Sequence, residues 1–146
     1  MTTLIHRLVD ACRAGNAPQV IARVPSGWAV MGSQQVLRGY SLLLPDPVVP
    51  HLNALSGAAR MAVLADAARF GDALLAVTGA RRVNYAIFGN QEPALHVHLV
   101  PRYDDEPDAL RTGHPWNYDW VAAPRFAVER DGELVLALRQ QLQLAP

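Results

Sequence analysis

The chain contains no lysine, and all 13 of its basic residues are arginines. This absence excludes enzymes that form a Schiff base on a lysine, including pyridoxal-phosphate enzymes, and ATPases whose phosphate loop needs a lysine. The 13 arginines are balanced by 13 acidic residues, which gives a formal net charge of zero. Since a neutral chain lacks the basic field that holds nucleic acid non-specifically, we expect no nucleic-acid partner.

Cysteine and long apolar runs are also scarce. Cys12 is the only cysteine, so neither an internal disulfide nor a multi-thiolate zinc site can form, and we predict that Cys12 packs on a helix face. No apolar run approaches the roughly 20 residues that cross a bilayer, and the first 15 residues do not resemble a signal peptide. We therefore expect a soluble, cytoplasmic protein without a membrane partner.

The composition nevertheless supports a substantial core. The chain has 146 residues, of which 51% are hydrophobic and 18% charged, and this length corresponds to one domain that folds without disulfides. The sequence contains no internal repeat and no low-complexity segment. We predict a single domain over residues 1–146.

Hydrophobic periodicity predicts helices at 3–14, 56–78 and 132–144. Thr2 or Thr3 is suited to cap the first helix, and Ser56 to cap the second, which Gly79 should end. One stripe of the second helix recurs at spacings of three and four, and we expect it to cover one face of a sheet. Its members are Met61, Leu64, Ala65, Ala68, Asp72 and Leu75.

Five segments have the residue pattern of strands, with alternating or β-branched residues bounded by turns. The first two should form a hairpin around a Pro-Ser-Gly turn, and the last two should be joined by a loop of hairpin length. The predicted strands are 20–24, 28–31, 39–44, 83–88 and 94–100.

Two of the five histidines, His96 and His98, alternate with apolar residues on the last predicted strand. Alternate residues of a strand share a face and rise about 3.3 Å each, so the two side chains should project side by side, roughly 6.6 Å apart. Such a pair suits nucleotidyl transfer, because one neutral imidazole can attack phosphorus while the other donates a hydrogen bond. It also suits two metal ligands, or simple packing on the sheet, and the residues alone leave these alternatives open.

The region around this pair resembles the histidine triad (HIT) superfamily. Residues 93–103 read Pro-Ala-Leu-His-Val-His-Leu-Val-Pro-Arg-Tyr, and residues 84–90 read Asn-Tyr-Ala-Ile-Phe-Gly-Asn. These stretches are similar to the family's alternating histidine motif and to the strand and loop of its bacterial diadenosine polyphosphate hydrolase subgroup. With the strand segments near 26–28 and 39–45, the likeness covers a core of about 20–103, which leaves 104–146 as a C-terminal extension.

The resemblance implies an α+β, HIT-like fold. Its expected form is a five-stranded antiparallel sheet with one long and one or two short helices, paired as a two-fold homodimer. It implies a nucleotide hydrolase or nucleotidyl transferase that acts on dinucleoside polyphosphates or nucleoside phosphoramidates, with a small-molecule nucleotide as partner and no cofactor. The alternative is a catalytically weakened nucleotide-binding or regulatory protein of the same fold.

The resemblance also assigns roles to particular residues. His96 would be the nucleophile that carries the nucleotidyl group, and His98 would hold the phosphate oxygens. Asn84 and Asn90 would supply amide donors to the substrate. The first histidine of the motif is replaced by Ala94, whose backbone carbonyl can still orient the His96 ring. We expect no metal, because the sequence offers no second His-x-His pair and no carboxylate on the same strand.

Three further features were weighed as site residues. Val48 occupies the position after the third strand where the family has a histidine, so a second polar ring is missing. Arg102 is expected to form a surface ion pair with Asp104 or Asp105 rather than to clamp a distal phosphate. The aromatic segment 114–120 is suited to stack a nucleobase or cover the site, but we expect it to dock by hydrophobic packing.

Overall fold

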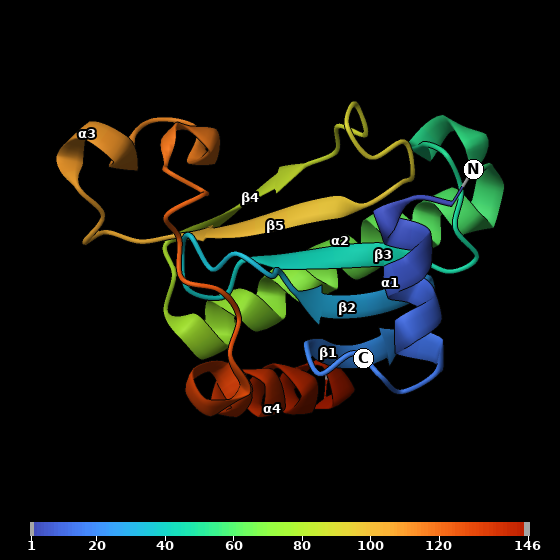
Figure 1. The fold of residues 1–146 in the computed structure, drawn as a ribbon, viewed down its shortest axis with the longest axis horizontal. Helices are drawn as coiled ribbons and strands as arrows, with labels where there is room; N and C mark the ends of the chain where they lie inside the picture. Colours follow the sequence, from blue (N-terminus) through green and yellow to red (C-terminus); the bar gives the residue numbers. More distant parts are fainter. Residues whose placement is uncertain (1, 145–146) are drawn as a thin grey trace.

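The computed structural model describes residues 2–144, which form an α+β fold around one antiparallel sheet (Figure 1). The five strands lie in the order β1-β2-β3-β5-β4, so β4 forms one edge of the sheet and β5 lies next to it. This arrangement confirms the predicted fold class. The strands are β1 (Val20–Val24), β2 (Gly27–Met31), β3 (Ser41–Pro45), β4 (Arg82–Ala86) and β5 (Val97–Arg102).

The helices begin and end close to the predicted positions. Thr3 caps the first helix, with its hydroxyl accepting a hydrogen bond from the His6 backbone N–H, and Gly79 ends the longest one in the left-handed conformation, with φ of 71°. The last helix starts four residues earlier than predicted. The helices are α1 (Leu4–Arg13), α2 (Gly57–Thr78), α3 (Asp108–Arg111) and α4 (Val128–Leu144), with short 3-10 turns η1 (Leu52–Ala54) and η2 (Pro115–Asn117).

Helix α2 buries a different face from the predicted one. Phe70 and Leu74 lie in the main core, whereas Met61 is 64% exposed and Leu64 is 42% exposed. The prediction was wrong because apolar residues occur all round this helix, so periodicity could not choose between its faces. The face with the bulkiest side chain, Phe70, packs on the sheet. Buried residues of α2 are Val63, Asp66, Ala67, Phe70, Gly71, Ala73 and Leu74.

The two faces of the sheet carry different kinds of residue on β5. Val97 and Leu99 lie in the core cluster that α2 and α4 cover, as the alternating pattern predicted. His98 and Arg102 alternate with them and therefore project from the opposite face. A second, smaller apolar cluster beneath α1 covers part of that face, and the remainder is available for a site.

The last two strands are displaced along the chain from their predicted positions. β5 runs from Val97 to Arg102 instead of 94–100, and β4 ends at Ala86 instead of 88. The backbone N–H groups of Ala94 and Leu95 donate to Glu92 and Val49, outside the strand pairing. His96 therefore lies just before the strand that carries His98. Within residues 2–144, no helix combines the length and apolar character that a membrane crossing requires.

Candidate active site

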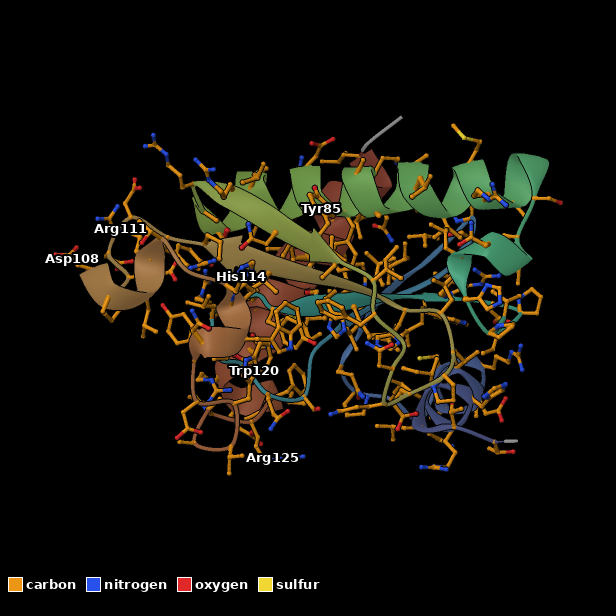
Figure 2. All side chains as sticks on the ribbon, turned by 90° about the horizontal axis from the view of Figure 1, so that it is seen from above. Tyr85, Asp108, Arg111, His114, Trp120 and Arg125 are labelled. Atoms are coloured by element: carbon orange, nitrogen blue, oxygen red, sulfur yellow. The ribbon has the colours of Figure 1, made fainter. Side chains whose placement is uncertain are left out.

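His96 and His98 line one cavity of about 400 Å³. Its walls come from the start of β5, the loop after β4, and η2 in the C-terminal segment. Figure 2 shows this segment, between His114 and Trp120, beside β4 and β5. The volume lies within the usual range of small-molecule sites. The lining residues are Phe88, Gly89, Asn90, Gln91, Glu92, His96, His98 and Trp116.

The His96 ring is held by the backbone of Ala94. Its Nδ1 lies 2.7 Å from the Ala94 carbonyl oxygen, and the residue as a whole is 8% exposed. Because a carbonyl oxygen only accepts hydrogen bonds, Nδ1 must carry the proton and donate it. In the neutral ring this leaves Nε2 unprotonated, with the lone pair that a nucleophile needs.

His98 is held by the side chain of Tyr40. Its Nδ1 lies 2.8 Å from the Tyr40 hydroxyl. Burial, and next the neighbouring His96 ring, lower the pKa of His98 from 6.5 to about 4, so this imidazole is neutral at pH 7. Burial raises the pKa of Tyr40, so its phenol keeps its proton.

The hydrogen bond between these two groups determines the tautomer of His98. Within residues 2–144 the Tyr40 hydroxyl has no other hydrogen-bond partner. It is therefore satisfied as a donor only when it donates to Nδ1 of His98, which places the remaining ring proton on Nε2. At Nε2, His96 thus offers a lone pair while His98 offers an N–H.

The two rings also share an aromatic enclosure. Their centroids are 4.8 Å apart and their planes meet at 68°. Trp116 meets the His98 ring edge-on at a centroid distance of 5.2 Å, and Phe88 lies 5.9 Å from the same ring. The side chain of Tyr40 closes the other side. These aromatic side chains place apolar surface beside the imidazoles, which strengthens the electrostatic interactions made next to them.

The predicted amide donors do not lie together. Asn90 lines the cavity of the histidine pair. Asn84 lies on β4, two positions before Ala86, the residue opposite His98. Its side-chain oxygen accepts a hydrogen bond of 2.8 Å from Arg102, and the residue lines a separate cavity. The structure therefore brings Asn90, but not Asn84, to the two imidazoles.

Ala94 and Val48, the two positions where the resemblance implies a missing histidine, belong to an apolar cluster. Ala94 is fully buried against residues of α1, β2 and β3, and Val48 packs against the same cluster. Cys12 lies here too, on the buried face of α1 as predicted, and burial raises the pKa of its thiol to about 11. Apolar contacts thus surround the residue whose carbonyl holds the His96 ring.

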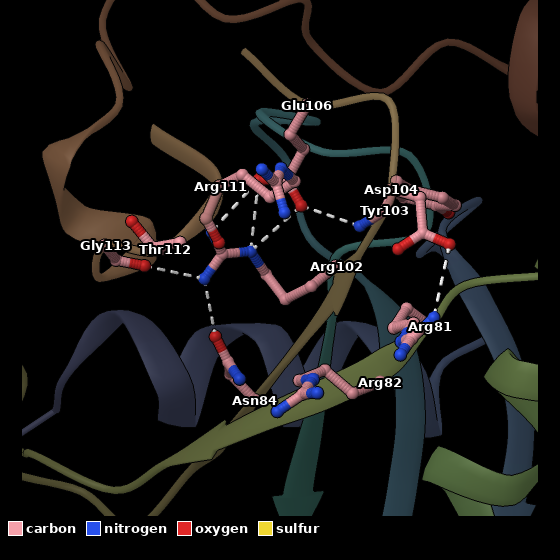
Figure 3. A pocket seen from close by; sticks show the side chains of 10 residues that line it. All are labelled: Arg81, Arg82, Asn84, Arg102, Tyr103, Asp104, Glu106, Arg111, Thr112 and Gly113. Atoms are coloured by element: carbon pink, nitrogen blue, oxygen red, sulfur yellow. Dashed lines mark hydrogen bonds and ion pairs between the residues drawn. The ribbon is translucent and has the colours of Figure 1, made fainter. Parts of the chain in front are cut away.

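Arg102 is not the surface residue that the sequence suggested. It is 6% exposed and pairs with Glu106 at 3.0 Å rather than with Asp104 or Asp105. Its remaining N–H groups donate to Asn84 and to backbone carbonyls of the 110–113 segment (Figure 3). Every guanidinium nitrogen is occupied, so the role of Arg102 is to anchor the chain that follows β5.

Sequence reasoning missed three residues that shape the site. Tyr40 is separated from His98 by 58 positions, and no local pattern indicates their contact. Phe88 was assigned to the end of a strand, but it lies in the loop. Trp116 belongs to the aromatic segment for which the sequence favoured packing over covering the site. It does contact Phe88 and Trp120, and it also lines the cavity.

Within residues 2–144, His96 and His98 are not joined by a third side chain that could complete a metal site. In the part of the chain that the structure describes, no group of three His, Cys, Asp or Glu side chains is placed to hold a metal ion. Glu92, the carboxylate on the cavity wall, accepts a hydrogen bond from the backbone N–H of Leu4 at 3.0 Å. The geometry favours acid, base and nucleophilic chemistry by the two imidazoles.

No protein-family model and no curated protein sequence matches the chain, whereas solved structures do. A histidine triad protein from Marinobacter aquaeolei is 17% identical, with a TM-score of 0.76 over 99% of this chain and 100% of that one. A histidine triad protein from Sinorhizobium meliloti is 18% identical, with a TM-score of 0.72 over 84% of this chain and 87% of that one. A Hit-like protein involved in cell-cycle regulation from Bartonella henselae is 14% identical, with 0.73 over 96% of each chain. The chain therefore has the fold of the histidine triad proteins.

Proposed function

We propose that this chain is a nucleotide hydrolase or nucleotidyl transferase. Its substrates are dinucleoside polyphosphates or nucleoside phosphoramidates, cleaved at the α-phosphate. The observation that carries the proposal is the complementary state of the two imidazoles, with a lone pair at Nε2 of His96 and an N–H at Nε2 of His98. The fold supports a nucleotide as the ligand, since a hypothetical histidine triad nucleotide-binding protein from Sulfolobus tokodaii shares it, at 12% identity and a TM-score of 0.73 over 94% of this chain and 91% of that one.

In the first step, Nε2 of His96 attacks the α-phosphorus, and a P–N bond forms. The bond from phosphorus to the bridging oxygen, or to the amine nitrogen, breaks, and its electron pair leaves with the departing group. A departing amine takes one proton from solvent water as it leaves, and the water that attacks in the second step returns one proton to solvent. The N–H of His98 donates to an oxygen of the phosphoryl group, where negative charge must be held. Asn90, on the cavity wall, adds an amide donor.

In the second step, water attacks the same phosphorus on the nucleotidyl-histidine. The P–N bond breaks, the nucleoside monophosphate is released, and Nε2 of His96 regains its lone pair. An alcohol or phosphate in place of water makes the reaction a transfer. The Ala94 carbonyl matters in both steps, because it stabilises the imidazole as positive charge develops on it.

The test is product formation from diadenosine tetraphosphate and from an adenosine phosphoramidate, in EDTA, by the natural protein and by His96→Ala. We expect turnover that is lost in His96→Ala and retained in His51→Ala, which alters an exposed histidine. Quenching the natural protein in alkaline denaturant should trap a phosphorus adduct on His96, because the P–N bond of a nucleotidyl-histidine survives alkali but hydrolyses in acid. Equal background from both proteins would contradict the assignment.

One observation favours a second function. Ala94 and Val48 lie in an apolar cluster next to the histidine pair, at the positions where the resemblance implies two polar rings. A chain with the nucleophile but fewer polar groups could bind a nucleotide with little turnover and act as a nucleotide-binding or regulatory protein. Nucleotide binding by calorimetry, without product formation from either substrate, is the result that this second function predicts.

We also propose that the protein acts as a homodimer. The exposed stripe of α2 lies next to edge strand β4, where Tyr85 is 49% exposed and Ile87 just beyond the strand is 39% exposed. Leu64, Tyr85 and Ile87 together line a shallow apolar cavity of about 430 Å³. A contiguous apolar surface that includes an unpaired strand edge is typical of a protein interface.

A further inference from the structure

Three cavities follow one another along the face of the sheet that carries the histidine pair. The cavity of the pair shares Phe88 and Trp116 with a groove of about 670 Å³ that runs along β4. This groove shares Asn84, Thr112 and Gly113 with a third cavity of about 560 Å³. Because neighbouring cavities share wall residues, the three lie in a row from the histidine pair to the third cavity.

The third cavity, which we call the arginine cavity, is dominated by positive charge (Figure 3). Four arginines line it, whereas its walls hold two carboxylates, those of Asp104 and Glu106. The charge excess lies in a concave surface, where low-dielectric walls strengthen the potential toward an anion. The four arginines are Arg81, Arg82, Arg102 and Arg111.

These arginines differ in how far they are already engaged. Arg102 forms the buried floor with Glu106 and has no donor to spare. Arg81 is paired with Asp104 at 3.7 Å, and Arg111 with Asp108 at 3.3 Å, and both pairs are solvent-exposed. Arg82 is exposed and, within residues 2–144, has no ion-pair or side-chain hydrogen-bond partner. Its guanidinium is the free cation of the cavity.

The pairing of β4 with β5 places this cation at a definite distance from the histidines. Ala86 lies opposite His98, and Arg82 lies opposite Arg102. Paired residues project from the same face, so Arg82 and His98 share a face and are four strand positions apart, or about 13 Å. That separation exceeds a single phosphate but suits the two ends of an extended nucleotide conjugate.

We propose that the arginine cavity binds a phosphate at the far end of the substrate whose α-phosphate is at His96. The substrate class is a nucleotide whose leaving part carries its own terminal phosphate, and Arg82 is the principal contact, with Arg111 and Arg81 beside it. This assignment rests on the proposed function for the reaction at His96. Asn84 lies between the two ends, and while its amide oxygen is held by Arg102, its amide N–H groups have no acceptor within residues 2–144.

A matched pair of substrates tests the proposal. They are adenosine phosphoramidates of aminooctyl phosphate and of aminooctanol, which differ only in the terminal phosphate. We expect the natural protein to have a KM about tenfold lower for the phosphate-ended compound, since a charge-assisted hydrogen bond contributes on this scale. Arg82→Gln should abolish that advantage and leave the neutral compound unchanged. Arg82→Lys should retain part of it.

The control is Arg7→Gln, which removes an exposed arginine from α1, at the other end of the molecule (Figure 1). It should keep the full preference for the phosphate-ended compound. Equal KM values for the two compounds in the natural protein would overturn the proposal. So would a preference that survives in Arg82→Gln.

Calorimetry with inorganic pyrophosphate separates this proposal from the proposed function. Binding that weakens about tenfold in Arg82→Gln supports the arginine cavity even if neither compound is cleaved. If both compounds are turned over with equal KM and pyrophosphate does not bind, the proposed phosphate site is refuted. The catalytic assignment to His96 then still stands. Pyrophosphate binding without any preference between cleaved compounds indicates a site for a free anion, and it overturns the link to the substrate.

Discussion

At the scale of single residues, the chemistry of the site depends on which group holds Nδ1 of each imidazole. His96 and His98 are nearly adjacent in sequence, yet one is held by a carbonyl and the other by a hydroxyl. The carbonyl can only accept a proton, and the Tyr40 hydroxyl is satisfied by donating one. Two identical side chains therefore acquire opposite functions at Nε2.

Tyr40→Phe should remove the N–H from Nε2 of His98 in part of the molecules and leave His96 unchanged. Without the hydroxyl, Nδ1 of His98 no longer has a donor, and the tautomer with the proton on Nδ1 becomes populated. We expect kcat to fall about tenfold with little change in KM. Nitrogen NMR shifts of the His98 ring should move toward the mixed tautomers. Tyr118→Phe, which removes a hydroxyl bonded to Glu106, should leave both readouts unchanged. An unshifted His98 spectrum in Tyr40→Phe would refute the tautomer assignment.

The lowered pKa of His98 makes stability depend on pH. The folded-state pKa is about 4 and the unfolded value is 6.5, so between these values the unfolded chain binds the extra proton. Stability should be unaffected above pH 7 and should decrease as pH falls through this window. Allowing for partial solvent exposure, the loss from pH 7 to pH 5 is about 1–2 kcal/mol.

Urea unfolding at the two pH values measures this loss. His98→Gln should show a smaller decrease than the natural protein, and His51→Gln, at an exposed position, should show the same decrease. Parallel pH dependence in the natural protein and His98→Gln would show that His98 is not the group responsible.

At the scale of elements, the buried ion pair of Arg102 and Glu106 connects β5 to the segment that carries Trp116. Glu106 also accepts hydrogen bonds from the Tyr103 backbone and from the Tyr118 hydroxyl. Together with Arg102 they lower the pKa of this carboxyl despite its burial. The pair therefore fixes where the aromatic wall of the histidine cavity begins.

Arg102→Met should be strongly destabilising. It leaves the Glu106 carboxylate buried without its cation, which costs about 3–5 kcal/mol in unfolding free energy. Adding Glu106→Gln should recover part of this loss, because the remaining group is neutral. Arg81→Gln, which breaks an exposed pair, should change stability by less than about 0.5 kcal/mol. Urea unfolding compares the variants, and equal effects of the two arginine substitutions would contradict the argument.

At the scale of the whole molecule, the apolar stripe of α2 predicts self-association. The double variant Met61→Glu, Leu64→Arg places charge in the proposed interface and should convert a dimer to a monomer in sedimentation equilibrium. The control is Leu136→Arg, at a 59% exposed position on α4, which should leave the mass unchanged. A natural protein that sediments as a monomer would refute the interface.

Local sequence patterns were sufficient for much of the architecture. The cap at Thr3, the left-handed stop at Gly79, the β1–β2 hairpin and the alternation around His98 each depend on residues within a few positions of one another. The Ala94 carbonyl lies two residues from His96, so this contact too was accessible from the chain. For such features the sequence by itself was decisive, because backbone geometry relates neighbours in the same way in any fold.

Only the tertiary structure decided the contacts between distant segments. The Tyr40 hydroxyl contacts His98 because β3 pairs with β5. The Asn84 side chain accepts a hydrogen bond from Arg102 because the register of β4 and β5 places the two residues on the same face. The buried face of α2 was likewise selected by packing, since the helix is apolar on several sides. Whether a side chain meets a partner some 20 to 60 positions away depends on strand order, register and volume, which local periodicity does not encode.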